Sequence, residues 1–310
     1  MSKEQRAKVD AMLRRPPAEK PLPVEALRAG FKALMDTMIV PDAVRTTPTT
    51  LGDLPALHVE PGSGARPATI LYFHGGGWVF GSPETALCLT AQLVDRTGFQ
   101  AYSVDYRLAP EHPFPAAIDD TLSAYRALLD SGLDPSTIAF AGDSAGGGLT
   151  VTTALAARDA GLPLPGAIVA FSPGLDATRT GESMKAKDGI DPIFTREAVK
   201  RTGTWYLDGA DPNQPLLSPA IYADLTGFPP MLIQVGTNEI LLDDSTRLAA
   251  RAKDADVNVI LDVTADVPHV FQSFAGGTLD EADQALDRAA LFLNQHLNTG
   301  NTVRTPAPED

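Results

Sequence analysis

The chain has 310 residues, of which 44% are hydrophobic, and a formal net charge of −14. This size and apolar content suit one large domain or a domain with a lid, and the acidic balance argues against nucleic acid as a partner. The single cysteine, Cys88, excludes an internal disulfide and a metal site built from several cysteines.

The N-terminal segment, residues 1–42, is predicted to form two amphipathic helices separated by prolines at 16, 17, 21 and 23. Apolar residues at helical spacing, among them Leu27, Phe31 and Leu34, mark a packing face that can also cover an active site. The charged start lacks the apolar core of a signal peptide, and no apolar run in the chain is long enough for a membrane span. We therefore expect a cytoplasmic protein without a membrane span.

A catalytic domain is predicted over residues 43–298, where strand-like apolar runs alternate with helical patterns. The strand-like runs lie at 55–60, 68–73, 100–105, 137–141, 167–172, 231–236 and 257–263. The helical patterns lie at 84–97, 115–131, 145–160, 243–255 and 280–297. This alternation is typical of an α/β fold with a mostly parallel sheet between two layers of helices, whose active groups gather at the carboxyl ends of the strands.

The alternation lapses in the region before the strand at 231–236. Turn signals at 189–192 and 209–212 bracket a helical stretch from Thr195 to Leu207. We predict that residues 183–212 form a cap insertion above the sheet. The polar, proline-rich tail, residues 299–310, is predicted to be disordered.

Residues 74–78, His-Gly-Gly-Gly-Trp, follow an early predicted strand. Glycines leave backbone N–H groups accessible, and such groups stabilise the oxyanion that develops during acyl transfer. We predict Gly75, Gly76 and Ala145 as the oxyanion donors.

Residues 142–146, Gly-Asp-Ser-Ala-Gly, lie between a predicted strand and an alanine-rich helix. This is where a nucleophile elbow belongs, because the serine must sit on a sharp turn with small neighbours. We predict Ser144 as the nucleophile. The two glycine-rich motifs in this order, each behind a predicted strand, indicate an acyl-transfer hydrolase.

A serine hydroxyl needs a base, which in this arrangement comes after the nucleophile and the acid in the chain. His269 follows the last predicted strand in a loop that enters a helix, and we predict it as the base. The other four histidines are His58 in a strand, His74 in the oxyanion loop, His112 before the nucleophile, and His296 in the last helix.

The acid that orients His269 should follow the next-to-last predicted strand, and several residues there compete for the role. Glu239 is preferred because it carries charge, whereas an asparagine in this place can lower turnover about ten-thousand-fold. Asn238 is the rival position, orienting the ring without charge at a reduced rate. Asp243 and Asp244 are a third alternative, although both also suit the first turn of a helix.

Three motifs carry a resemblance to a known family. They are His-Gly-Gly-Gly-Trp at 74–78, Tyr-Arg-Leu-Ala-Pro-Glu-His-Pro-Phe-Pro at 106–115, and Gly-Asp-Ser-Ala-Gly-Gly at 142–147. Together they resemble the hormone-sensitive-lipase-like family of α/β-hydrolases, in particular its bacterial carboxylesterase branch, over roughly residues 40 to 297. The resemblance implies an α/β-hydrolase fold with a mostly parallel eight-stranded sheet and a helical cap. It also implies a carboxylesterase that needs no cofactor, is often dimeric, and favours short acyl chains.

Carried over by position, the family's roles fall on Ser144 as the nucleophile and His269 as the base. Gly75, Gly76 and Ala145 take the place of the oxyanion donors. The sequence departs from the family at the acid, where aspartate is usual at the position aligned with Asn238.

We therefore predict a serine carboxylesterase, a homodimer that acts on small-molecule esters with short to medium acyl chains. A lactonase or amidase with the same triad, and a catalytically weak ligand-binding protein on this fold, are the alternatives. We expect no metal, since the sequence contains no His-Glu-x-x-His and its histidines are scattered. The aromatic residues placed near the pocket are Trp78, Phe80, Trp205 and Tyr206.

Overall fold

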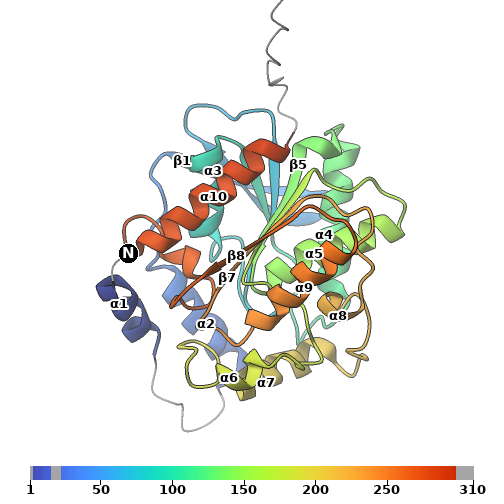
Figure 1. Cartoon of the computed structure of the whole chain (residues 1–310). Coiled ribbons are helices and arrows are strands. Elements are labelled where there is room, and N and C mark those ends of the chain that lie inside the picture. Colours follow the sequence, from blue (N-terminus) through green and yellow to red (C-terminus); the bar gives the residue numbers. More distant parts are fainter. Residues whose placement is uncertain (1–2, 15–21, 298–310) are drawn as a thin grey trace, which may run out of the picture.

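A computed structural model describes residues 3–14 and 22–297, and its centre is an eight-stranded sheet (Figure 1). The strands are β1 (Val44–Leu51), β2 (Leu54–Pro61), β3 (Thr69–Phe73), β4 (Gln100–Val104), β5 (Ile138–Asp143), β6 (Ala167–Phe171), β7 (Met231–Gly236) and β8 (Val259–Thr264). Their order is β1-β2-β4-β3-β5-β6-β7-β8. The pairs β1–β2 and β2–β4 are antiparallel, and the other neighbouring pairs are parallel. The predicted α/β-hydrolase fold class is confirmed.

Helices cover both faces of the sheet (Figure 1). One face carries α3 (Leu87–Thr97) and α10 (Asp280–His296), and the other carries α4 (Ala116–Asp130), α5 (Ala145–Asp159) and α9 (Leu242–Asp254). The short α8 (Pro219–Tyr222) packs beside α9.

The two faces of the sheet each bury a separate apolar cluster. In β3, Ile70 and Tyr72 belong to the cluster under α3 and α10, whereas Leu71 and Phe73 belong to the cluster under α4 and α5. Successive side chains of a strand point to opposite faces, so a strand covered on both sides must be apolar throughout. This explains why the central strands read as continuous apolar runs.

The edge strand β1 lies outside the runs that the sequence analysis identified as strands. Its sequence, Val-Arg-Thr-Thr-Pro-Thr-Thr-Leu, is mostly exposed, and it pairs with β2 at the edge of the sheet. An exposed edge strand needs no apolar face. Proline has no N–H to donate, and β1 tolerates Pro48 because an edge strand, unlike a central strand, is hydrogen-bonded on one side only. The sequence therefore contained no apolar pattern at this strand.

Four helices lie outside the two layers that cover the sheet. They are α1 (Lys3–Leu13), α2 (Val24–Met35), α6 (Ser183–Ala186) and α7 (Arg196–Leu207). Figure 1 shows α2, α6 and α7 gathered at one end of the sheet. The helical pattern predicted over 195–207 is thus confirmed as α7, and the tail predicted at 299–310 lies outside the described residues.

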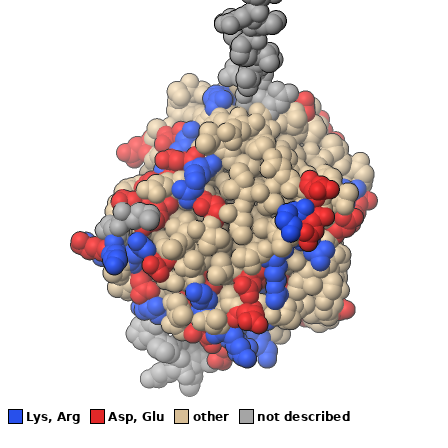
Figure 2. Space-filling model, viewed as in Figure 1, with Lys and Arg blue, Asp and Glu red and all other residues tan. Residues whose placement is uncertain are grey.

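Charged side chains on the face viewed in Figure 2 form small groups of both signs around large uncharged areas. No extended basic patch is visible on this face. Within residues 3–14 and 22–297, no helix combines the length and the apolar character that a bilayer crossing requires.

Candidate active site

Ser144 occupies a sharp turn between β5 and α5, with φ 53° and ψ −117°. Its backbone N–H donates to the carbonyl of Phe171 at 2.8 Å, which fixes the turn against the neighbouring strand β6. A Cβ on Gly146 would lie 1.9 Å from the carbonyl oxygen of Phe73, so the close approach of the helix to β3 requires glycine there. The small neighbours predicted for the elbow thus have a steric reason.

The side chains of Ser144, His269 and Glu239 form a continuous line of hydrogen bonds. Nε2 of His269 lies 2.9 Å from Oγ of Ser144, and Nδ1 of the same ring lies 2.7 Å from Oε2 of Glu239. All three residues are buried, with exposed fractions of 8% for Ser144, 4% for His269 and 0% for Glu239. Each residue follows the carboxyl end of a different parallel strand, β5, β8 and β7, which is why distant segments meet here.

The carboxylate of Glu239 is held on its second oxygen as well. Oε1 accepts hydrogen bonds from the backbone N–H of Gly236 at 2.7 Å and from Oγ of Ser172 at 2.9 Å. Oγ of Ser172 in turn accepts from the backbone N–H of Val270, the residue after His269, at 3.0 Å. Ser172 therefore ties the acid loop to the histidine loop, a connection that the sequence analysis missed.

Two opposing effects act on the pKa of His269. Burial, the largest single effect, lowers it, but the Glu239 carboxylate together with other nearby carboxylates stabilises the imidazolium, so the pKa lies above the ordinary 6.5. The carboxylates of Asp191 and Asp143 act in the same direction. A ring with this pKa accepts a proton from a serine more readily than a free imidazole does.

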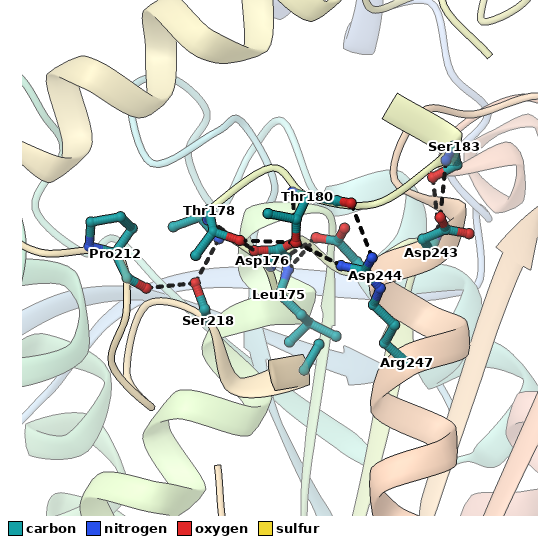
Figure 3. A network of polar contacts seen from close by, with 12 residues as sticks. Leu175, Asp176, Thr178, Thr180, Ser183, Pro212, Ser218, Asp243, Asp244 and Arg247 are labelled. Atoms are coloured by element: carbon teal, nitrogen blue, oxygen red, sulfur yellow. Dashed lines mark hydrogen bonds and ion pairs between the residues drawn. The ribbon is translucent and has the colours of Figure 1, made fainter. Parts of the chain in front are cut away.

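The other candidate acids have different partners. The backbone N–H of Asn238 donates to Val267, and both ring nitrogens of His269 are already bonded to Ser144 and Glu239. Figure 3 shows Asp243 facing Ser183 and Asp244 facing the loop of Leu175 and Asp176. Asp243 accepts from the backbone N–H of Ser183 at 2.9 Å, and Asp244 accepts from those of Leu175 and Asp176 at 2.7 and 2.9 Å.

The glycine loop after β3 differs from the prediction at Gly75. Its N–H donates to Oδ1 of Asp143 at 3.0 Å, so it is not free for an oxyanion. A Cβ on Gly75 would also lie 2.1 Å from Oδ2 of the same carboxylate. By contrast, within the described part of the chain no acceptor takes the N–H groups of Gly76, Gly77 and Ala145, and all three residues line the pocket at Ser144.

Asp143 anchors this loop from inside the protein. Its Oδ1 accepts from the hydroxyl of Tyr72 at 2.9 Å as well as from Gly75. Burial raises the pKa of Asp143 to about 6, although the Tyr72 hydroxyl and the nearby His269 oppose the rise. The loop is thus positioned by a carboxylate that belongs to the elbow itself, so the elbow and the loop are fixed together.

A pocket of about 600 Å³ opens over Ser144 and His269, and residues from α2 and α7 line it together with the glycine loop. Phe194 stands edge-on to the His269 ring, with 4.9 Å between ring centroids. Of the aromatics predicted near the pocket, Trp78 and Phe80 line it, and Tyr206 stacks on Trp78 at 4.5 Å. Trp205 is not among the lining residues and lies instead beneath the guanidinium of Arg201.

Comparisons with protein families, with known sequences and with solved structures identify the family of this chain. A family model for the alpha/beta hydrolase fold matches residues 70–273. The chain is 40% identical over 232 residues to an acetyl-hydrolase of Streptomyces hygroscopicus, a match that covers 75% of this chain and 77% of that relative. It is 33% identical over 301 residues to a carboxylesterase of Mycobacterium tuberculosis, with 92% and 87% covered.

The crystal structure of an esterase from the bacterial hormone-sensitive lipase family superposes with a TM-score of 0.91 at 40% identity, covering 96% of this chain and 100% of that one. The chain belongs to this family. It is a carboxylic ester hydrolase, as its esterase and carboxylesterase relatives indicate. The resemblance drawn from its three motifs is confirmed.

Several residues of the esterase's site carried no signal in the sequence. Ser172 and Asp143 act through hydrogen bonds that join segments far apart in the chain. Asp191, from the segment between β6 and β7, accepts from the backbone N–H of Ile240, the residue after Glu239, at 2.9 Å. From the sequence alone, an aspartate two residues after a glycine looks like an ordinary loop residue until its partner is known.

Proposed function

We propose that the esterase hydrolyses short- to medium-chain acyl esters through an acyl-enzyme, with Ser144 as the nucleophile, His269 as the base and Glu239 as the orienting acid. The observation that carries this proposal is the unbroken line of hydrogen bonds from Oγ of Ser144 through the ring of His269 to Glu239. The orientation of the ring by Glu239 leaves Nε2 free to take the serine proton.

The chemistry then follows in two halves. Oγ of Ser144 attacks the ester carbonyl while Nε2 of His269 removes the hydroxyl proton, and the imidazolium returns that proton to the leaving alcohol. In the second half, water attacks the acyl-enzyme with the same proton transfers through His269, which releases the carboxylic acid and restores the hydroxyl of Ser144. In both halves Glu239 offsets the positive charge on the ring, which is the charge pairing that raises the pKa of His269.

The oxyanion would be bound by the N–H groups of Gly76, Gly77 and Ala145. The two loop donors replace the pair Gly75 and Gly76 that the sequence predicted, because the N–H of Gly75 is engaged by Asp143. Loss of one such donor typically costs about 3–4 kcal/mol of transition-state stabilisation.

We further propose that the N-terminal segment 1–42 and the insertion 183–212 form the cap of a catalytic domain over 43–298. Supporting this, Leu27 and Phe31 of α2 and Val199 and Thr202 of α7 line the pocket above Ser144. A cap of this kind excludes water from the reacting ester and shapes the substrate site.

Short to medium acyl chains fit the size of the pocket and the name of the Streptomyces relative, an acetyl-hydrolase. The lactonase and amidase alternatives use the same groups, so p-nitrophenyl butyrate, a short lactone and a short anilide should be compared directly.

A homodimer is part of the proposal as well. The edge strand β8 carries Ile260 and Val263, each nearly half exposed, and exposed apolar side chains on a strand with one free edge favour pairing with a second copy. Light scattering after size exclusion tests this point, and a monomer at micromolar concentration would contradict it.

The decisive experiment replaces Ser144 with alanine and measures p-nitrophenyl butyrate hydrolysis. We expect a loss of about a million-fold in kcat, as when a serine hydrolase loses its nucleophile, with an unchanged circular dichroism spectrum. Rapid mixing of the wild-type esterase should show a burst of nitrophenol if the acyl-enzyme accumulates. Retained turnover by Ser144→Ala would refute the assignment.

A further inference from the structure

Arg179 lies in the loop after β6 and reaches the wall of the active-site pocket. It lines this pocket together with Trp78 and Gly174, and the same three residues also border a small adjoining cavity of about 20 Å³. Its guanidinium faces α7, since a Cβ on Gly203 would lie 3.6 Å from one of its terminal nitrogens. The arginine is thus placed between the cap helix and the glycine loop.

The guanidinium of Arg179 forms neither a hydrogen bond nor an ion pair within residues 3–14 and 22–297. The closest acids are engaged elsewhere (Figure 3): Asp176 binds Arg247, and Asp244 binds backbone N–H groups. Burial lowers the pKa of Arg179, and the neighbouring carboxylates of Asp244 and Asp176 offset only part of this.

A second arginine strengthens the positive character of this wall. Arg201, on α7, also lines the pocket, and its Nε is buried without a partner among the described residues. A partly buried guanidinium without a bonded carboxylate can still donate charge-assisted hydrogen bonds, so such an arrangement in a substrate pocket points to an anion supplied by the ligand.

The position of Arg179 also indicates which part of an ester would meet it. The leaving alcohol must take its proton from Nε2 of His269, on the side of the pocket where Phe194 stands against the ring. Arg179 instead lines the small cavity together with Trp78 of the glycine loop and with residues of α5 and α7. The acyl part of the ester, which the glycine loop holds by its carbonyl oxygen, is therefore the part within its reach.

We propose that Arg179 is a specificity-determining residue that binds a free carboxylate on the acyl part of the substrate, so that monoesters of short dicarboxylic acids are preferred. This proposal rests on the ester hydrolysis proposed above. A planar guanidinium can donate two parallel hydrogen bonds to a carboxylate, which a neutral acyl chain cannot accept.

The test compares monoethyl succinate with ethyl pentanoate, an uncharged ester of similar length, by titrating the released acid at constant pH. The wild-type esterase should show the higher kcat/KM on monoethyl succinate. Arg179→Met should lower the ratio of the two kcat/KM values about 10- to 100-fold, the effect expected for a lost charge-assisted hydrogen bond. Arg179→Lys should restore part of the ratio.

Arg126→Met is the matched control, because it removes the same charge from an exposed position on α4 that does not line the pocket. Its ratio should equal that of the wild type. An unchanged ratio in Arg179→Met, including an equal loss on both esters, would overturn the proposal, as would a wild-type preference for ethyl pentanoate.

A third substrate separates the two sides of the pocket. Butyryloxyacetate carries its carboxylate on the alcohol part, and Arg179→Met should affect it less than monoethyl succinate. A larger effect on butyryloxyacetate would overturn the acyl-side assignment. If the wild-type protein hydrolyses ethyl pentanoate while the ratio stays unchanged in Arg179→Met, only the role of Arg179 fails. If it hydrolyses no ester, the proposed function fails with it.

Discussion

Glu239 and Asp244 are two buried carboxylates that follow the same strand, β7, yet they face different partners. Glu239 presents Oε2 to the ring of His269 at 2.7 Å. Asp244 presents Oδ2 to the backbone N–H groups of Leu175 and Asp176 (Figure 3). One carboxylate meets a group that can gain and lose a proton, and the other meets amides that cannot.

This difference teaches that burial alone does not mark a catalytic acid. Both side chains are almost completely buried, at 0% and 2% exposure, so neither could be preferred on that ground. What separates them is the group at hydrogen-bond distance. We therefore expect changes at Glu239 to act on the rate, and changes at Asp244 to act on the free energy of unfolding.

Among the variants that test this comparison, the largest effect should come from Glu239→Gln. We expect kcat on p-nitrophenyl butyrate to fall by about a thousand- to ten-thousand-fold, because an uncharged partner stabilises the wrong tautomer and leaves the imidazolium unbalanced. The Glu239 carboxylate raises the pKa of His269, so its loss should lower that pKa and move the acid limb of the kcat/KM profile to lower pH.

Asp243→Asn is the control for this variant, because Asp243 binds the backbone of Ser183 and has no contact with His269. It should keep most of the wild-type rate. Full activity in Glu239→Gln, or a large loss of kcat in Asp243→Asn, would contradict the assignment of the orienting role to Glu239 and not to Asp243.

Asp244→Ala should act mainly on stability. Two buried N–H groups lose their acceptor, at roughly 1–3 kcal/mol each, so urea denaturation should show a loss of about 2–6 kcal/mol. The rate per folded molecule should change little by comparison. If Asp244→Ala kept the wild-type urea midpoint but lost most of its kcat, Asp244 would belong to the catalytic machinery.

The pH dependence of stability sharpens the same contrast. Burial raises the pKa of Asp244 to about 7, so between its ordinary value of 3.8 and 7 the folded state holds a proton that the unfolded state has released. The contribution of this group to the free energy of unfolding must therefore fall as the pH rises through that window. Asp244→Asn should flatten this part of the curve, measured by urea titrations from pH 4 to 7.

Tyr72→Phe should have a smaller effect, on the anchor of the glycine loop. It removes one of the two hydrogen bonds to Oδ1 of Asp143, and a net loss of about 1 kcal/mol corresponds to roughly a fivefold fall in kcat. Tyr125→Phe is a matched control, since its hydroxyl binds the carbonyl of Pro163 away from the pocket. Equal kcat in Tyr72→Phe and Tyr125→Phe would contradict a role for the Tyr72 hydrogen bond in positioning the glycine loop.

The smallest effect should come from Asn238→Asp. With Glu239 already bonded to His269, a carboxylate at 238 should change kcat by no more than about twofold, as for substitutions without a buried partner. A large increase would mean that position 238 is the place of the acid and that Glu239 only supports it.

Much of the architecture could be read from local pattern. Strands such as β3 and β7 are continuous apolar runs because both of their faces are buried. The edge strand β1 is mostly polar and exposed, and could not be recognised in this way. The elbow at Ser144 was recognisable because its turn requires small neighbours, a constraint written into adjacent residues.

The sequence by itself determined the alternation of strands and helices, the place of Ser144 at an elbow, and the order of nucleophile, acid and base. These follow from periodicity and from steric limits on neighbouring residues. Only the tertiary structure decided that Glu239 faces His269, and that Asp143 engages the N–H of Gly75. The reason is that a hydrogen bond forms only within about 3 Å and at a defined angle, and for residues on separate loops that geometry exists only once the sheet has brought the loops together.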